Sequence, residues 1–256
     1  MTRMLFLLVM PLLILADDLG DQLLSATRKG DVAQVTALLD KGADINAKTR
    51  YKQTPLFFAC DRGNADMVKL LIARGAALDL EDTFYHASPI SWAMSKNHEE
   101  IVKMLIEAGA NPSDPLKDSI RNGNKARFAM VLDKGKLTPE MLNDALLIAA
   151  FSKRDEMAKA LEGKGARKVE FPADEQTLKS YEGKFEEGGT SFVFGVKDGK
   201  LTITIQGAPV DLVPSAKDRF KWIQQSLEFT FERDDKGVTA VRFASRGGDM
   251  KLKKVN

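Results

Sequence analysis

The sequence contains few of the residues that most often carry out catalysis or bind metals. It has one cysteine, Cys60, and two histidines, His86 and His98. One cysteine excludes an intramolecular disulfide, so the fold must be held by packing. Two histidines exclude a histidine-rich metal site and disfavour a Ser-His-Asp triad. We therefore predict a non-enzymatic protein with no catalytic residues, no metal and no cofactor.

An excess of charge of one sign is also lacking. Lys and Arg number 38 and Asp and Glu 36, which gives a net charge of +2, and the two signs are interleaved along the chain. Because nucleic acid is bound by a concentrated basic surface, we expect no nucleic acid partner. The 256 residues, 44% hydrophobic and 29% charged, are typical of a globular protein with one large or two ordinary domains.

Long apolar runs are lacking except at the N-terminus. Arg3 precedes an almost uninterrupted apolar run from Met4 to Ala16, and two aspartates end the run. This is the layout of a secretory signal peptide. As a helix the run reaches about 20 Å, less than the roughly 30 Å of a bilayer core. We predict a signal peptide at residues 1–16, cleavage after Ala16 and a secreted or periplasmic protein without a stable membrane anchor. A retained anchor or a buried first helix is the alternative.

A short apolar pattern that ends in Gly-Ala occurs three times. It reads VTALLDKGA from Val35, VKLLIARGA from Val68 and VKMLIEAGA from Val102. A period near 33 residues indicates stacked helix pairs, because one pair cannot bury both of its faces alone. The pairs Thr54-Pro55, Ser88-Pro89 and Asp114-Pro115 predict helix starts, with the Thr, Ser or Asp oxygen as cap and proline in the first turn.

This unit resembles the ankyrin repeat, closely over residues 21–111 and more loosely to about 168. The matching motifs are Thr54-Pro55-Leu56 with Ala59, Gly63-Asn64, Val68 to Ile72 and Gly75-Ala76. Phe57 stands where the family usually has histidine, so the family's threonine–imidazole hydrogen bond is expected to be absent. The resemblance implies an α-helical solenoid at 17–168 of about five repeats, the last two degenerate. It also implies β-hairpin fingers before Pro55 and Pro89, and only a tight turn before Pro115.

The helical period ends near residue 168, and alternation of period two follows. After a linker at 169–179, we predict a β-domain at 180–256 with about eight short antiparallel strands, closed into a small barrel or sandwich. The expected strands are Tyr181–Phe185, Ser191–Val196, Leu201–Ile205, Val210–Val213, Phe220–Ile223, Leu227–Glu232, Val238–Phe243 and Met250–Val255.

Residues 178–255 resemble the lipocalin-like domain that follows serine beta-lactamase-like hydrolases. The matching residues include Tyr181 to Phe185, Val196 to Leu201 and Phe229 to Phe231. In those proteins the domain is an accessory, and the Ser-x-x-Lys of the hydrolase is absent from this sequence. The phenylalanines of this region either fill the barrel or line a cavity for a small apolar ligand, and filling is the commoner outcome.

The predicted finger tips have an unusual composition. Turns usually contain Asp, Asn or Gly, but here the tips are Arg50-Tyr51-Lys52 and Phe84-Tyr85-His86. Tyrosine and arginine are favoured at interfaces, although packing between the fingers would account for them equally well. Trp92 faces either the concave groove or the core. By contrast, we expect Cys60 to be a buried thiol and His98 to cap a helix.

These features predict an exported interaction scaffold that binds a protein partner through Arg50, Tyr51, Lys52, Phe84, Tyr85, His86 and Trp92 and the concave face. The alternative is a carrier of a small apolar ligand in the β-domain, with the repeats as its mount. A hydrolase is disfavoured because no nucleophile, base and orienting group can be assembled from this sequence.

Overall fold

The computed structural model describes residues 6–167, 174–225, 227–245 and 248–255, and it describes side chains from Asp18 onward except that of Ser245. The chain divides into two compact units, Met1–Met141 and Leu142–Asn256. The division falls within a helix, whereas the predicted boundary is the linker at 169–179.

The described residues of the first unit form helix pairs. The pairs are α1 (Phe6–Lys29) with α2 (Val32–Asp40), α3 (Pro55–Asp61) with α4 (Ala65–Ala73), α5 (Pro89–Ser95) with α6 (Glu99–Ala108), and α7 (Ser113–Asn122) with α8 (Lys125–Lys134). Helix α9 (Pro139–Phe151) begins at the end of this unit and forms a further pair with α10 (Asp155–Gly163). The predicted solenoid of about five repeats is confirmed.

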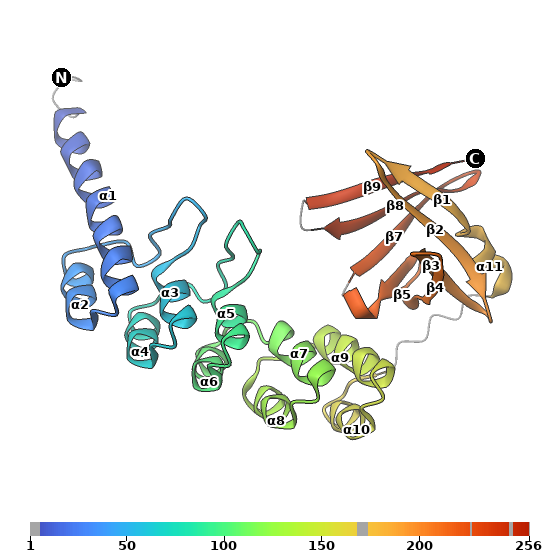
Figure 1. Ribbon diagram of the computed structural model, residues 1–256, viewed down its shortest axis with the longest axis horizontal. Coiled ribbons are helices and arrows are strands. Elements are labelled where there is room, and N and C mark those ends of the chain that lie inside the picture. The colour runs from blue at the N-terminus through green and yellow to red at the C-terminus, as the bar shows by residue number, and fades with distance from the viewer. Residues whose placement is uncertain (1–5, 168–173, 226, 246–247, 256) are drawn as a thin grey trace. The chain divides into compact units, whose positions relative to one another are not determined.

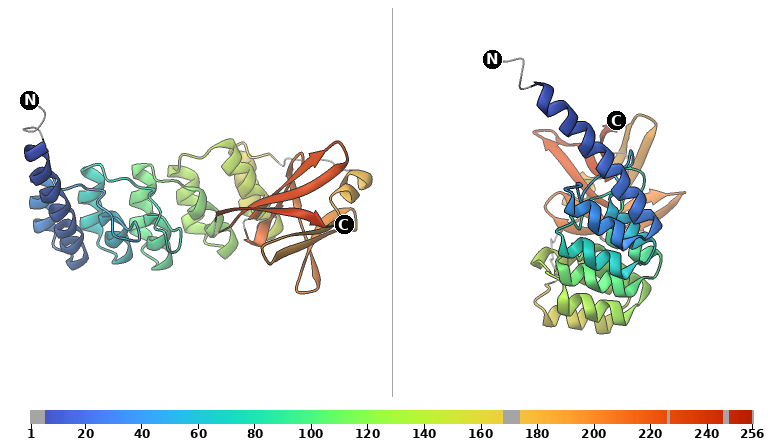
Figure 2. Two further views of the ribbon diagram at one scale, coloured as in Figure 1. Left: turned by 90° about the horizontal axis from the view of Figure 1, so that it is seen from above. Right: turned by 90° about the vertical axis from the view of Figure 1, so that its left-hand side faces the viewer.

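The helix pairs of the first unit stack in series. Helices α1, α3, α5 and α7 contact one another in order, as do α2, α4, α6 and α8, so that each row buries its apolar stripe against the next repeat (Figure 1 and Figure 2). One continuous core runs from Leu23 to Ala110 and includes Val35, Val68 and Val102, all fully buried. The Gly-Ala pattern therefore recurs because each repeat contributes one equivalent layer to this core.

Hydrogen bonds that span nearly the same number of residues, 31 and 32, tie neighbouring repeats together. The side-chain oxygen of Asn46 accepts a bond from the Ala77 N–H at 2.9 Å, and Asp79 accepts one from the Asn111 N–H at 2.9 Å. An exposed ion pair joins Arg74 to Asp40 at 2.8 Å. These ties are side chain to backbone or at the surface, and none needs the histidine that Phe57 replaces.

Three of the predicted helix caps differ from expectation. Thr54 caps α3 by accepting from the Phe57 N–H, as predicted. Ser88 occupies the N-cap of α5, but its hydroxyl bonds to Ser91 and makes no cap bond. Asp114 lies inside the first turn of α7, which begins at Ser113, so the predicted cap there is wrong. His98 also holds an N-cap position without capping.

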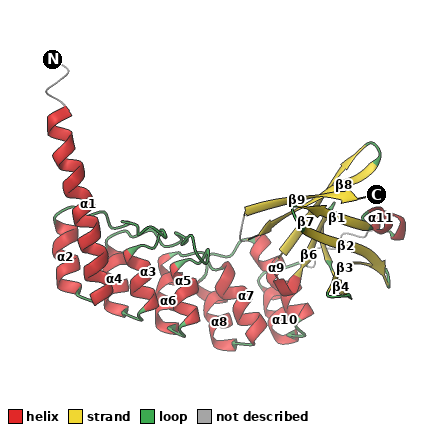
Figure 3. Cartoon of the chain, turned by 45° about the horizontal axis from the view of Figure 1, so that its top comes forward, coloured by secondary structure: helices red, strands yellow, loops and turns green. Residues whose placement is uncertain are grey.

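The two fingers project from the same side of the first unit, as the loops before α3 and α5 in Figure 3. We call residues 43–54 the first finger and 76–88 the second finger. Neither contains an assigned strand, so the predicted β-hairpins are reduced to isolated bonds such as Thr49 N–H to the Gln53 carbonyl and Asp82 N–H to the Ala87 carbonyl. Thr83 N–H donates to the Tyr51 carbonyl at 2.9 Å, which joins the two fingers.

The second unit contains a short helix where the linker is expected. Residues 168–173 lie outside the described residues, but Glu175–Ser180 form helix α11, which Asp174 caps through the Thr177 N–H. Leu178 of α11 is buried in the core of the β-domain, and Tyr181 ends the helix instead of opening a strand. Figure 3 shows α11 beside β2 (Thr190–Lys197). The domain therefore begins before the predicted residue 180.

The β-domain is one antiparallel sheet that nearly closes on itself. Its described strands are β1 (Gly183–Glu187), β2, β3 (Lys200–Ile205), β4 (Ala208–Asp211), β5 (Val213–Ala216), β6 (Arg219–Trp222), β7 (Leu227–Asp234), β8 (Gly237–Ser245) and β9 (Gly248–Val255). The order is β4-β3-β2-β1-β9-β8-β7-β6-β5. Because the edge strands β4 and β5 are separated only by Leu212, the sheet must curl until its edges meet. The predicted small barrel is confirmed.

The described residues contain nine strands where eight are predicted. The expected strand Val210–Val213 is two strands that belong to opposite edges of the sheet and change direction at the buried Leu212. Pro209 lies in β4 and Pro214 in β5. Proline has no N–H for a sheet ladder and is tolerated at edges, which fits the break at this point.

Aromatic rings occupy the interior of the barrel. Phe194, Phe229 and Phe231 are buried, and the ring centroid of Phe194 lies 5.3 Å from that of Phe229 and 5.0 Å from that of Phe231. Tyr181, Phe185, Phe192, Phe220 and Phe243 extend the same cluster. The expectation that these side chains fill the barrel agrees with this packing.

The predicted signal segment is described only in part. Residues 1–5 lie outside the described residues, and residues 6–16 are the helical start of α1, without described side chains. None of the helices in the described part of the chain is long and apolar enough to cross a membrane. Cleavage after Ala16 and export stay predictions.

Candidate functional site: the fingers and the inner helices

Six aromatic rings form a continuous row across the fingers and the helices α3 and α5. Neighbouring ring centroids are 6.1 Å apart for Tyr51–Phe84, 4.6 Å for Phe84–Tyr85 and 5.5 Å for Tyr85–Trp92. The row continues from Trp92 to Phe57 at 5.0 Å and from Phe57 to Phe58 at 5.3 Å. We call these six residues the aromatic row. It connects four of the predicted site residues to two that sequence reasoning did not assign to the site.

The outer half of the aromatic row is exposed. Tyr51, Phe84 and Tyr85 are 39%, 65% and 57% exposed, and they are the exposed large apolar residues among the described side chains of the first unit. Phe57 is buried and Trp92 is half-buried. Trp92 thus lies between the two alternatives of groove and core: its ring contacts the buried Phe57, and its indole N–H donates to Asp82.

Asp82 holds the second finger in shape. It is only 1% exposed, and its carboxylate accepts from the backbone N–H groups of Phe84, Tyr85 and Ala87 and from the indole N–H of Trp92. Although burial acts to raise the pKa of Asp82, these hydrogen bonds outweigh it and lower the pKa below its usual value. The ionised form is therefore the one that orders the finger.

The second finger is expected to loosen in acid. A carboxyl group with a folded pKa below its unfolded pKa of about 3.9 contributes stability that is complete above the unfolded value and is lost as pH falls through the folded value. We expect the fluorescence of Trp92, in a Trp222→Phe background, to stay constant from neutral pH to about pH 4 and to change below it. Asp82→Asn should abolish this step and give the changed signal at neutral pH, because its amide N–H₂ would face the N–H donors. An unchanged acid step in Asp82→Asn would contradict this assignment.

Cations stand at both ends of the aromatic row. The guanidinium of Arg50 lies 4.5 Å from the Tyr51 ring centroid, and that of Arg28, on α1, lies 4.3 Å from the Phe58 centroid. Lys52 and His86 are exposed at the finger tips with left-handed backbones, at φ 59° and 51°. His86 directly follows Tyr85 of the aromatic row, and within the described part of the chain it forms no hydrogen bond or ion pair with the row.

The surroundings of Cys60 and His98 indicate that both residues serve in packing between the repeats. Cys60 is fully buried in the repeat core, and burial raises the pKa of its thiol, which disfavours the thiolate. His98 does not cap α6. Its ring lies against Gly63, where a Cβ would come within 2.6 Å of the imidazole, and its Nε2 lies 3.4 Å from the Asp61 carbonyl. Among the described residues, no three His, Cys, Asp or Glu side chains are grouped to hold a metal ion.

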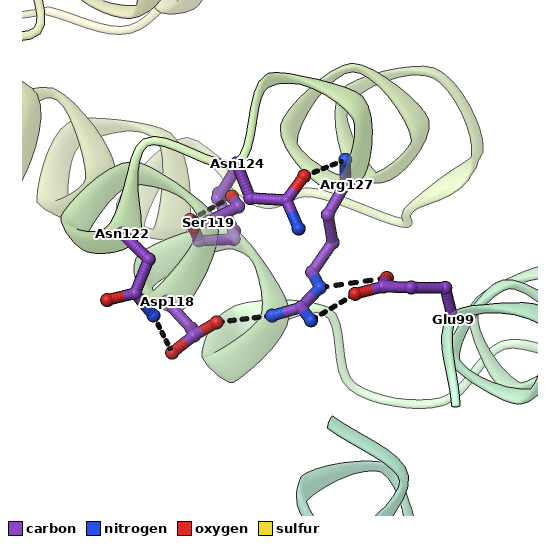
Figure 4. A network of polar contacts seen from close by, with 7 residues as sticks. Glu99, Asp118, Ser119, Asn122, Asn124 and Arg127 are labelled. Carbon is purple, nitrogen blue, oxygen red and sulfur yellow. Dashed lines mark hydrogen bonds and ion pairs between the residues drawn. The ribbon is translucent and has the colours of Figure 1, made fainter. Parts of the chain in front are cut away.

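A second polar cluster lies where α6, α7 and α8 meet (Figure 4). The guanidinium of Arg127, 6% exposed, forms a two-pronged bond with Glu99 and a further bond with Asp118. Hydrogen bonding to Glu99 raises the pKa of Arg127, and the charges of both carboxylates add to this, while burial acts in the opposite direction. Arg127 and Asp118 line an open pocket of about 350 Å³ together with Ser91 and Ser95. Because Glu99 lies on α6, Asp118 on α7 and Arg127 on α8, the cluster joins three helices.

The stacked helix pairs and projecting fingers define an ankyrin-repeat unit, and comparison with known proteins agrees. The family model for ankyrin repeats in three copies matches residues 23–115. Residues 23–115 are therefore ankyrin repeats. The match ends before the β-domain, so the resemblance of residues 178–255 to a lipocalin-like accessory domain stays a prediction.

Curated relatives match over the repeats alone. A homolog of transient receptor potential cation channel subfamily A member 1 from Caenorhabditis elegans is 41% identical over 69 residues, which are 27% of this chain and 6% of the relative. Putative ankyrin repeat protein FPV240 of Fowlpox virus (strain NVSL) is 46% identical over 26% of this chain and 16% of its own length. The 2-5A-dependent ribonuclease of Mus musculus is 44% identical over 25% of this chain and 8% of its own length. The chain thus spans less than a fifth of each relative, and ankyrin repeats are general protein-interaction modules.

Sequence reasoning missed the inner half of the site. From the sequence alone, Phe57 and Phe58 are ordinary residues of the first helix of their repeat, α3, and Arg28 is a charged residue at the end of α1. The replacement of the usual histidine by Phe57 was the available signal, because it places a second ring beside Phe58 and next to the Trp92 position one repeat later.

Proposed function

We propose that the protein is an exported, non-enzymatic scaffold whose ankyrin repeats bind a protein partner through the finger tips and the concave face. The exposed half of the aromatic row carries this proposal. Large apolar side chains at loop tips lose solvent contact only when another surface covers them, and aromatic residues dominate the energy of most protein interfaces. In this row they are already ordered by ring contacts and by Asp82, so binding costs little side-chain entropy.

The triple replacement Tyr51→Ala, Phe84→Ala and Tyr85→Ala tests the proposal. We expect affinity capture from the native compartment, with the mature chain as bait, to recover a partner with the wild type and to lose it at least about tenfold with the triple variant. The melting temperature should stay nearly unchanged, because Phe84 and Tyr85 are more than half exposed and Tyr51 is 39% exposed at a loop tip. Phe151→Ala, an exposed aromatic in the second unit, is the matched control and should bind normally.

Two outcomes would contradict the proposal. Equal loss with Phe151→Ala would move binding away from the fingers, and a large drop in melting temperature of the triple variant would make the three rings part of the core.

The export component has its own test. The mass of the protein recovered from the extracytoplasmic fraction should correspond to a chain that starts at Asp17, and an intact N-terminus there would refute cleavage after Ala16.

The ligand-carrier alternative concerns the β-domain alone. Extraction of the purified protein followed by mass spectrometry would reveal a co-purified apolar ligand. A barrel from which no apolar molecule is recovered would end this alternative.

A further inference from the structure

We infer that the aromatic row binds an acidic peptide segment that carries an aromatic or aliphatic side chain between its carboxylates. This inference rests on the proposed function and specifies its partner. The observation behind it is that an arginine lies over the ring at each end of the row and has no carboxylate partner among the described residues.

The two arginines are oriented for carboxylate binding. Arg28 stacks on Phe58 and Arg50 stacks on Tyr51, at 4.3 and 4.5 Å from the ring centroids. A guanidinium stacked on a ring keeps its N–H groups pointing outward in its own plane, where they can bond a carboxylate with two parallel bonds. Stacking also fixes the side chain, so less entropy is lost when the carboxylate binds.

Further positive charge surrounds Arg50 on the first finger. Lys48, Arg50 and Lys52 are all exposed, and within the described part of the chain none of them forms an ion pair with a carboxylate. Arg28 is likewise exposed and unpaired among the described residues. Four cations therefore flank the row with their charges available to a ligand.

The carboxylates of the two fingers are mostly engaged by backbone N–H groups. Asp44 accepts from Asn46, Asp79 accepts from Asn111, and Asp82 accepts from the second finger itself. Glu81 is the remaining finger carboxylate and is exposed. These bonds leave the negative charges in place, so the positive charge lies on the first finger, where Lys48, Arg50 and Lys52 outnumber Asp44, and at Arg28. At those two places it complements the carboxylates of an acidic segment.

The apolar part of the ligand is set by the rings between the arginines. Phe84 and Tyr85 expose more than half of their surface, while their inner edges pack on Tyr51 and Trp92. A peptide that supplied only carboxylates would leave this surface in water. An aromatic or aliphatic side chain between the carboxylates would cover it and bury apolar area on both sides.

The ring geometry favours a peptide over a single-stranded nucleic acid. In proteins that bind single-stranded nucleic acid, successive bases stack on the open faces of aromatic side chains. Here neighbouring rings meet edge to face, with interplanar angles of 73° for Tyr51–Phe84, 79° for Phe84–Tyr85 and 68° for Tyr85–Trp92. Each ring therefore covers part of the face of its neighbour, and the row offers no series of parallel platforms.

Selection from a random peptide library displayed on phage, with the full-length mature chain as target, tests the inference. We expect the selected peptides to contain Asp or Glu on both sides of an aromatic or aliphatic residue. Their binding should weaken as salt is raised, since exposed charge pairs are screened. An oligothymidine strand is tested in parallel and should not compete with them.

Variants of the arginines then locate the contact. For a selected peptide, the double variant Arg28→Gln and Arg50→Gln should raise the Kd about tenfold or more, because two charge-assisted contacts are lost. Arg28→Lys with Arg50→Lys keeps the charge but loses the planar fork, and should raise the Kd by a smaller factor. Lys103→Gln removes an exposed cation of α6 and is the matched control, with an unchanged Kd. An unchanged melting temperature shows that the variants are folded.

The outcomes separate this inference from the proposed function. Selected peptides that are basic or uncharged, but still require Tyr51, Phe84 and Tyr85, would overturn the acidic partner and leave the scaffold intact. Competition by oligothymidine, or equal effects of Lys103→Gln and the arginine variant, would also overturn it. Selected peptides that bind the triple alanine variant as well as the wild type would overturn both.

Discussion

Replacing Phe231 with alanine should lower the free energy of unfolding of the β-domain by about 3–5 kcal/mol, the usual cost of removing a buried phenylalanine. Phe231 is 3% exposed and its ring contacts four others, those of Tyr181, Phe185, Phe194 and Phe220. Loss of the ring therefore opens a cavity at the centre of the barrel. No neighbouring ring can fill that cavity without giving up its own contacts.

Denaturant unfolding that is followed through a single tryptophan measures this effect. The described units contain one tryptophan each, Trp92 and Trp222, so a Trp92→Phe background reports on the β-domain. Phe231→Leu keeps most of the volume and should cost less than about 1.5 kcal/mol. Val193→Ala, on an exposed side chain of the same sheet, should cost about 0.5 kcal/mol or less. A loss for Phe231→Ala that is no larger than for Val193→Ala would show that the barrel interior is not packed as described.

Replacing Arg127 with alanine should lower the free energy of unfolding of the first unit by about 2–3 kcal/mol. The guanidinium is buried and bonds two carboxylates from different helices, Glu99 of α6 and Asp118 of α7. Removal of one member of a buried pair leaves the other charges without a partner. The cost stays below that of a fully buried triad because the side chains of Glu99 and Asp118 are 47% and 37% exposed and water can reach them.

A surface ion pair between two other repeats supplies the control. Arg74 and Asp40 also join neighbouring repeats, but their side chains are 38% and 61% exposed, so Arg74→Ala should cost about 0.5 kcal/mol. Arg127→Lys should fall between the two, because an ammonium cannot reach both carboxylates with a planar fork. The reporter is Trp92 in a Trp222→Phe background. Phenylalanine suits position 222, whose indole N–H is buried without a hydrogen-bond partner. Equal costs for Arg74→Ala and Arg127→Ala would show that burial does not set the value of these pairs.

Local rules predicted the repeats well because each repeat is built from contacts close in the sequence. The stripe Val68, Leu71 and Ile72 marks a buried helical face without knowledge of the rest of the chain.

The helix caps were less predictable than the helices themselves. Ser88 and His98 have the right position, but their side chains found other partners, Ser91 and the Asp61 carbonyl. An N-cap side chain must accept from an N–H of the first turn. Ser88 instead meets a hydroxyl of its own helix, and His98 meets a carbonyl of the preceding repeat.

The β-domain was less well predicted because its contacts join distant residues. Alternation indicated the strands, but nothing within Val210–Val213 shows that Leu212 separates the two edges of the sheet. The pairing of β1 with β9 brings Phe185 opposite Lys254, across nearly the whole domain. Loop closure over such distances leaves no local pattern.

The sequence by itself determined the serial ankyrin unit, the change to a β-domain and the aromatic finger tips, because periodicity and turn composition are properties of neighbouring residues. Only the tertiary structure decided that Tyr51, Phe84, Tyr85 and Trp92 form one row with Phe57 and Phe58 and that Asp82 orders it. Only the structure shows that the row ends at arginines with no ion-pair partner in the described part of the chain. Those residues come from three repeats, and the contacts that join them exist only after the repeats have stacked.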